Sequence, residues 1–279
     1  MKKLLNLKVS LTVLGSVILL ATPATALAAK PVQTGPSKGG SGGGSTGSTS
    51  SVLTGNDVSW PQCSKSLPKG QLFGIVGVND GLANTTNPCF ATELAWANAS
   101  VGGTGQDKAA VYVNTADPGT GVADWPTSGS STKYGSCTGG NTTACAYQYG
   151  WNMATADAQT RIGTNNPANF KWWLDVETDN SWETGSTGIT NNVADLEGMT
   201  DYFQSVGGRV GLYSTASQWK AIAGTVSTTS SLHGLDSWLP GYSKLTAAKN
   251  ACSVAGLTGG KTTVTQYVSK QLDYDYSCI

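Results

Sequence analysis

Short apolar runs that end in polar residues recur along the chain. Four of them are compact and rich in valine and aromatic residues, as is typical of strands buried in a parallel sheet. They cover residues 72–79, 109–114, 171–177 and 209–214, and residues 236–242 and 262–268 are predicted as the last strands. Asp57 is expected at the end of an earlier, first strand.

Helix-like stretches separate these runs. They cover residues 89–100, 145–162, 191–207 and 215–224. The third is predicted to begin after Thr190 and to end at Gly207-Gly208, because glycine commonly follows the last turn of a helix. Alternation of strands and helices over this length indicates an α/β fold with a parallel sheet.

Two arrangements of such a sheet compete, a doubly wound sheet and a closed barrel. The loop VGVNDGLANTTN lacks the Gly-x-Gly-x-x-Gly spacing and the immediate helix that a dinucleotide site needs. The strands instead end in side chains suited to chemistry or sugar binding, and in a barrel such ends meet on one face. We therefore predict a single, irregular TIM-like (β/α) barrel.

The N-terminal segments do not belong to this pattern. Residues 1–29 have a basic start, an apolar middle and an Ala-x-Ala motif, which predict a secretory signal peptide cleaved after Ala28 or Ala29. An uncleaved membrane anchor is the alternative, and no later stretch is long and apolar enough to cross a bilayer. Residues 30–54 are rich in Gly and Ser and are predicted to form a flexible linker before a domain at 55–279. We expect a secreted protein, either free or associated with the cell wall.

The charge of the chain narrows its partners. Loss of Lys2, Lys3 and Lys8 with the signal leaves 14 of the 17 basic residues against 17 acidic ones. Only two arginines are present and no basic run follows the signal, so we do not expect nucleic acid as a partner. A low charge with many Gly, Ser, Thr and Asn residues suits a secreted monomer that meets neutral polymers.

The six cysteines are expected to form disulfides, because an even number in an exported chain is typical of a disulfide framework. Pairing of neighbours would join Cys63 to Cys89, Cys137 to Cys145, and Cys252 to Cys278, although other connectivities are open. The spacing fits no zinc site, and a single histidine, His233, does not allow a multi-histidine metal site. We expect no metal and no cofactor, and acid–base chemistry carried by carboxylates.

Asp175 and Glu177 are the strongest candidates for that chemistry. They stand two residues apart at the end of a predicted strand, so both side chains should point to the same side. Their carboxyls would lie about 5 to 7 Å apart, near the range of retaining glycosidases. Like charges this close raise one pKa, so that one group stays protonated as an acid. The alternative is a strand end whose acids face water or cap the next loop.

Other residues that suit a sugar site fall near the same strand ends. Asp57 lies in DVSWP, which also fits a turn before Pro61, and Asp273 or Asp275 supplies a carboxylate near the C-terminus. Nine tryptophans supply rings that stack on sugars, although those in helices are expected to pack in the core. The predicted substrate-binding residues are Trp60, Asn79, Asn114, Tyr213, Trp238, Gln266 and Tyr267.

These motifs occur in an order that resembles a known family. NDVSWPQ, WLDVE, GLYST before a Trp-containing helix, SWLPGY, and TQY before a late Asp are similar to the glycoside hydrolase family 25-like barrels, which include secreted bacterial and phage lysozymes (muramidases). The resemblance spans Gly55 to Cys278 and is closest to a secreted actinobacterial-type branch with DVSWPQC, YVNTADPG and AYQYGWN. Two departures are GVNDG at 77–81, where the lysozymes have a Lys-Ala-x-Glu-Gly-like strand, and a Gly/Ser/Thr-rich insertion at 119–143.

The resemblance implies roles for four carboxylates. Glu177 would be the general acid, and Asp175 would orient or stabilise the reacting group, through assistance from the N-acetyl group of the substrate. Asp57 would be a further catalytic carboxylate, and Asp275, in preference to Asp273, would close the site. We expect a secreted, disulfide-stapled glycoside hydrolase that cleaves peptidoglycan or a related N-acetylated polysaccharide. The alternatives are a barrel that binds glycan without cleaving it and a surface-displayed interaction module.

Overall fold

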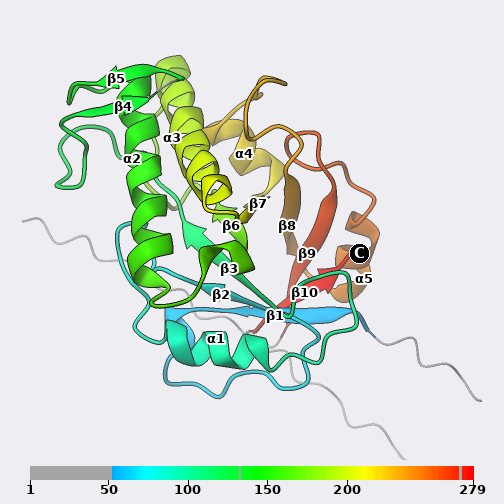
Figure 1. The fold of residues 1–279 in the computed structure, drawn as a ribbon. Coiled ribbons are helices and arrows are strands. Elements are labelled where there is room, and N and C mark those ends of the chain that lie inside the picture. Colours follow the sequence, from blue (N-terminus) through cyan, green and yellow to red (C-terminus); the bar gives the residue numbers. More distant parts are fainter. Residues whose placement is uncertain (1–51, 132, 270–271) are drawn as a thin grey trace, which may run out of the picture. The chain divides into compact units, whose positions relative to one another are not determined.

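Eight strands close into one barrel in the computed structural model, which describes residues 52–131, 133–269 and 272–279 (Figure 1). The strands are β1 (Thr54–Val58), β2 (Gly74–Gly77), β3 (Ala109–Asn114), β6 (Lys171–Asp175), β7 (Arg209–Tyr213), β8 (Asp236–Tyr242), β9 (Thr262–Ser269) and β10 (Leu272–Ser277). Their order around the barrel is β1-β10-β9-β8-β7-β6-β3-β2. The predicted α/β barrel is confirmed, and β1 begins at Thr54, one residue before the predicted domain boundary.

The irregularity of the barrel lies in β10, which is antiparallel to both of its neighbours, β1 and β9. The prediction that residues 262–268 form the last strand was therefore wrong. Residues Leu272–Ser277 alternate Asp with Tyr, and the acids face the barrel interior while Tyr274 stacks on Tyr267 of β9, with ring centroids 5.3 Å apart. Strands usually place apolar side chains in the interior, whereas β10 places acidic ones there. Its sequence therefore shows the reverse of the hydrophobic pattern expected for such a strand.

Within the described residues, five helices accompany the strands: α1 (Phe90–Asn98), α2 (Thr143–Ala156), α3 (Gly185–Ser205), α4 (Ala216–Ile222) and α5 (Leu245–Ala251). Short 3₁₀ turns cover Trp60–Gln62 and Pro167–Asn169, and a π-helical turn, Asp157–Arg161, continues α2. The insertion between β3 and α2 contains a small hairpin of β4 (Gly129–Ser131) and β5 (Gly135–Cys137).

The start of α3 differs from the prediction. The helix begins at Gly185 rather than after Thr190. Its first turns are rich in Gly, Ser and Thr, which are weak helix formers. The side chain of Asn192, one turn further on, stabilises this start, because its amide accepts the Glu183 N–H at 3.2 Å and donates to the Glu183 carbonyl at 3.0 Å. A tertiary contact of this kind overrides local propensity.

Helices α2 and α3 pack side by side through two glycines (Figure 1). A Cβ atom at Gly150 would lie 2.0 Å from the Asp195 carbonyl oxygen, and one at Gly198 would lie 2.1 Å from the Tyr147 carbonyl oxygen. Neither position has room for a side chain. The close backbone approach therefore requires glycine on both helices.

Side-chain alternation divides the hydrophobic residues of β6 between two of the hydrophobic cores. In β6, Trp172 and Leu174 pack outward against the helices, whereas Trp173 points into the barrel with Ile75 and Trp238. The same alternation sends Asp175 to the interior side, one step above Trp173. An apolar barrel floor thus lies directly below a polar layer at the carboxyl ends of the strands.

Three disulfides staple the barrel in the predicted pairing. Cys63–Cys89, Cys137–Cys145 and Cys252–Cys278 have Cα separations of 5.6, 4.6 and 5.4 Å. The second joins β5 to the first turn of α2, and the third joins the end of α5 to the C-terminal segment. The predicted disulfide framework is confirmed.

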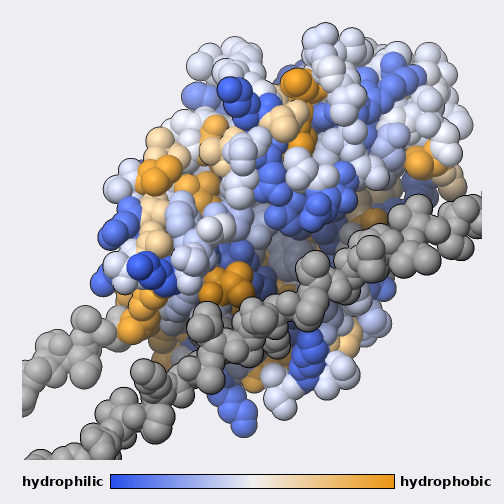
Figure 2. Space-filling view, turned by 180° about the vertical axis from the view of Figure 1, so that it is seen from behind, coloured by the Kyte–Doolittle hydropathy of each residue, from blue (hydrophilic) through white to orange (hydrophobic). Residues whose placement is uncertain are grey.

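Figure 2 shows the hydrophobic residues on one face of the molecule as small separate patches among polar ones. No helix within the described residues combines the length and the apolar character that crossing a bilayer would require. The predicted signal peptide and residues 30–51 of the predicted linker lie outside the described residues.

Candidate active site

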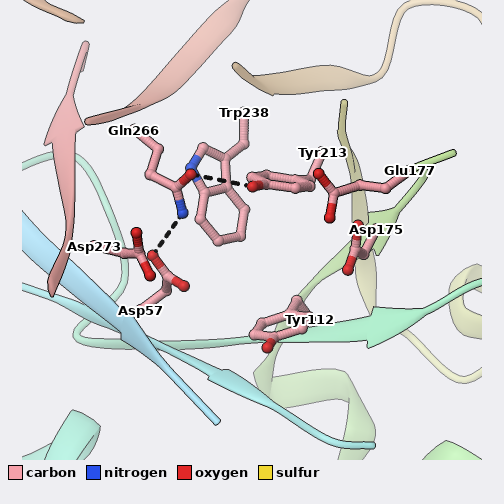
Figure 3. Close-up of a pocket in the computed structure, with 8 residues that line it drawn as sticks. All are labelled: Asp57, Tyr112, Asp175, Glu177, Tyr213, Trp238, Gln266 and Asp273. Atoms are coloured by element: carbon pink, nitrogen blue, oxygen red, sulfur yellow. Dashed lines mark hydrogen bonds between the residues drawn. The ribbon is translucent and has the colours of Figure 1, made fainter. Parts of the chain in front are cut away.

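A cavity of about 150 Å³ lies at the carboxyl ends of the barrel strands (Figure 3). Its walls are formed by Asp57, Tyr112, Asp175, Glu177, Tyr213, Trp238, Gln266 and Asp273. Four of these eight side chains are carboxylic acids, and none is basic. The cavity can therefore exchange protons with a bound molecule and stabilise positive charge.

Asp175 and Glu177 lie side by side at one end of the cavity (Figure 3). Strand β6 ends at Asp175, so the two acids do not share a strand as predicted. The Val176 N–H still donates to the Tyr213 carbonyl at 2.9 Å, and the Val176 side chain is fully buried in the outer core. Alternation thus continues for one residue past the strand and returns Glu177 to the cavity side.

The two acids differ in burial and in hydrogen bonding. Asp175 is buried, and one of its oxygens accepts the Asn114 amide N–H at 3.2 Å, while Oδ1 has no partner among the described residues. Burial, and then the charges of Glu177, Asp57 and Asp179, raise the pKa of Asp175 well above its ordinary value. Glu177 is only half-buried.

Burial also raises the pKa of Glu177. A hydrogen bond with Gln218 acts in the opposite direction, and the charge of Asp179 adds to the rise. No Lys or Arg in the described chain pairs with Glu177. A partly accessible carboxyl with a raised pKa is suited to donate a proton.

Asp57 and Asp273 face each other at the opposite end of the cavity (Figure 3). They come from the paired strands β1 and β10, whose register sets Gly55 against Asp275 and Asn56 against Tyr274. The Gln266 amide donates to Asp57 Oδ2 at 2.8 Å. Burial, followed by the charge of Asp273, nevertheless raises the pKa of Asp57 to about 7.

Asp275 lies behind this pair and does not line the cavity. It is fully buried, and neither of its oxygens has a hydrogen-bond donor among the described residues. Burial and the nearby Asp57 raise its pKa well above the ordinary value. The indole N–H of Trp238 opposes this rise, although the two groups do not meet hydrogen-bond geometry. The interaction between the carboxyls of Asp275 and Asp57 acts in the opposite direction on Asp57, whose pKa it lowers.

An aromatic wall connects the two acidic ends. Tyr213 packs edge-on against Trp238, with ring centroids 4.4 Å apart, and its hydroxyl donates to Gln266 Oε1 at 3.1 Å. Gln266 in turn donates to Asp57, so its amide orientation is set from both sides. Tyr213, Trp238 and Gln266 were all predicted to bind substrate, and all three line the cavity.

Four other predicted residues lie away from the cavity walls. Trp60 is exposed in the turn after β1, with its ring against Gly81. Asn114 bonds Asp175 without lining the cavity, and Asn79 is fully buried and has no surface for a ligand. Tyr267 points outward and stacks on Tyr274, because it alternates with the inward-facing Gln266.

Two cavity residues were missed or ranked too low by sequence reasoning. Tyr112 precedes Asn114 by two positions in β3, so the period-2 pattern carried a signal for it. Asp273 was placed second to Asp275, yet it is Asp273 that reaches the cavity. The choice between Asp273 and Asp275 became clear only from the register of β10 against β1.

The described residues contain one cluster of three side chains of the kind that bind metals, Cys63, Cys89 and Glu93. Both cysteines are joined in a disulfide, so this cluster offers a single carboxylate rather than a ligand set. The carboxyls of the cavity do not form such a cluster.

Comparison with protein-family models and with curated proteins gives no match for the sequence. Solved structures give similarities at low identity. A muramidase from Trichobolus zukalii is 17% identical, with a TM-score of 0.48 and coverage of 81% of this chain and 93% of that one. A family GH25 lysozyme from Aspergillus fumigatus is 15% identical, with a TM-score of 0.46 and the same coverage. A lysozyme from Streptomyces coelicolor is 15% identical, with a TM-score of 0.43 and coverage of 82% and 93%. All three neighbours are described as muramidases or lysozymes.

Proposed function

We propose that the chain is a glycoside hydrolase that cleaves peptidoglycan or a related N-acetylated polysaccharide. The observation that carries this proposal is the pair of Asp175 and Glu177 in one cavity at the carboxyl end of the barrel, both with raised pKa values. Glycosidases act through two such carboxyls, one of which must hold a proton at working pH. Barrel enzymes place their reacting groups at this end of the strands.

Glu177 is assigned as the general acid because it is the more accessible of the two. It donates its proton to the glycosidic oxygen as the bond from that oxygen to the anomeric carbon breaks. The acetamido carbonyl oxygen of the substrate attacks the same carbon, and Asp175 accepts a hydrogen bond from the acetamido N–H. Water then opens the cyclic intermediate, with the Glu177 carboxylate taking the proton of the water.

The far end of the cavity is assigned to binding and charge stabilisation. Asp57 and Asp273 line this end and would face the positive charge that develops on the sugar ring. Trp238 and Tyr213 present aromatic surface, which suits the apolar face of a sugar. Gln266 offers an amide in a fixed orientation.

A barrel that binds glycan without cleaving it is the second candidate. It is favoured by the departure from the lysozyme pattern at residues 77–81, where Asn79 is fully buried and offers no surface to a ligand. Glu177, however, neither enters the core nor pairs with a Lys or Arg of the described residues, which supports the hydrolase. We also propose export through the predicted signal peptide and action as a monomer outside the cell.

The test uses purified protein with insoluble peptidoglycan and with N-acetylated glucosamine oligomers. The hydrolase predicts new reducing ends with wild type and none with Glu177→Gln, while both proteins sediment equally with the glycan. Sedimentation without product from either protein would establish the binding barrel. No sedimentation and no product would show that the protein neither binds nor cleaves these glycans.

A further inference from the structure

The buried side chain of Asn79 is held in one orientation by every hydrogen bond that it makes. Its carbonyl oxygen accepts the Asn114 backbone N–H at 2.8 Å. Its amide nitrogen donates to Asp157 Oδ1 at 3.0 Å and to the carbonyls of Ala83 and Thr85 at 3.3 and 3.1 Å. A flipped amide would set its NH₂ group against the Asn114 N–H and its oxygen against three acceptors.

Asn114 connects Asn79 to the candidate active site by hydrogen bonds. It is the last residue of β3 and pairs in register with Asp175 of β6. Its backbone is bonded to Asn79, and its side-chain amide donates to Asp175 Oδ2 at 3.2 Å. Because Asp175 Oδ1 has no partner among the described residues, the Asn114 amide is the side-chain donor that orients this carboxyl.

The other end of the chain of bonds lies in the π-helical turn that follows α2. Within it, Arg161 donates to Asp157 Oδ1 at 2.7 Å and to the Ala83 carbonyl at 2.8 Å. Both side chains are buried, with 8% of Arg161 and none of Asp157 exposed. π-Turns are rare in helices and are frequently found at functional sites.

We propose that Asn79, Asp157 and Arg161 are positioning residues for Asp175, acting through Asn114. Together the five residues form a hydrogen-bond chain from the π-turn through the ends of β2 and β3 to the carboxyl on β6. The proposal rests on the proposed function in that it takes Asp175 to assist the reaction. It explains why a buried amide occupies the place where the sequence indicated a ligand contact.

A double-mutant cycle tests whether Asn79 acts through Asn114. Asn79→Ser and Asn114→Ala are each expected to lower kcat on the glycan by about 10-fold with KM changed less than about 2-fold. If the two residues act in one chain, the double variant loses about 10-fold as well, and not the product of the two losses. A multiplicative loss would overturn the proposal.

The matched control is Asn192→Ser. Asn192 is also fully buried, and its amide donates to the carbonyls of Glu183 and Ile222 at 3.0 and 2.9 Å, away from the cavity. It should lower stability about as much as Asn79→Ser while leaving kcat unchanged. If both serine variants lowered kcat equally, Asn79 would be a structural residue only.

A second readout needs no turnover. The carboxyl carbon of Asp175 is titrated by NMR, in the field of Glu177, Asp57 and Asp179 and of the phenols of Tyr112 and Tyr213. A donated hydrogen bond favours the ionised carboxylate, so loss of the Asn114 bond should raise the Asp175 pKa further. Asn79→Ser should also raise it, and Asn192→Ser should not.

The two proposals fail in different ways. An unchanged Asp175 titration in Asn79→Ser would overturn the positioning chain, whatever the activity. A shifted titration in a protein that cleaves no glycan would support the positioning chain and overturn the hydrolase.

Discussion

Asp117 offers a quantitative test of how strongly burial perturbs the acids of this barrel. It lies in the loop after β3 and is fully buried. Its Oδ1 accepts the Gly119 N–H at 3.4 Å, and its Oδ2 has no partner among the described residues. Burial, followed by the charge of Glu183, raises the pKa of Asp117 to about 7, against 3.8 for the ordinary group.

A raised folded-state pKa means that the folded protein keeps this proton where the unfolded chain releases it. The unfolding free energy therefore falls as the pH rises from about 4, and the loss is complete above about pH 7. At 1.36 kcal/mol for each pKa unit, burial of this one carboxylate costs on the order of 4 kcal/mol at pH 8. The cost is absent only well below pH 3.8, where the carboxyl is protonated in both states.

Asp117→Asn removes the titration while keeping the shape of the side chain. The unfolding free energy of wild type and variant is measured by urea unfolding at intervals from pH 4 to pH 8.5. The difference should move in favour of the variant by about 4 kcal/mol over this range, since an amide does not ionise. An offset of about 1 to 3 kcal/mol from the unpaired amide NH₂ should be the same at every pH.

The control is Asp80→Asn, a change at an exposed loop position. If the Asp117→Asn curve departed from that of the wild type by no more than the curve of this control, a pKa rise of Asp117 through burial would be refuted. The same reasoning for Asp57, Asp175 and Asp275 would then lose its support.

Three further predictions concern stability and the cavity. Replacing Cys252 and Cys278 by Ala should lower the unfolding free energy by about 3 kcal/mol, seen as a lower Tm; an unchanged Tm would contradict the stapling role. Gly150→Ala should cost about 2 kcal/mol or more, because its Cβ would overlap the Asp195 carbonyl, whereas Gly140→Ala has room; equal unfolding curves would count against the packing described. Asp273→Asn should lower the Asp57 pKa from about 7, as observed by NMR titration; a constant midpoint would show that Asp273 does not act on Asp57.

The sequence was sufficient to predict the barrel and six of the eight residues that line its cavity. Compact apolar runs predicted β2, β3, β6, β7, β8 and β9, and polar residues at their ends predicted that the site lies there. The Asp-x-Glu spacing was informative because backbone alternation persists through Val176. Neighbour pairing of the cysteines was also correct.

The parts that were not predicted depend on contacts between distant segments. Asn79 follows a strand just as Asp175 does, but its partner Asp157 lies 78 residues further along the chain, in a π-turn that no local pattern indicates. The choice between Asp273 and Asp275 required the register of an antiparallel strand within a mostly parallel barrel. Tyr267 faces outward because it alternates with the inward-facing Gln266. The residue types alone do not show which of the two faces inward.

The central claim is that Glu177 supplies the proton that cleaves a glycan. The most direct measurement is the release of reducing ends from purified peptidoglycan by wild type and by Glu177→Gln, with glycan binding followed in the same samples. We predict release by wild type, a loss of at least about 100-fold in the variant, and unchanged binding. Equal release by the two proteins would contradict it.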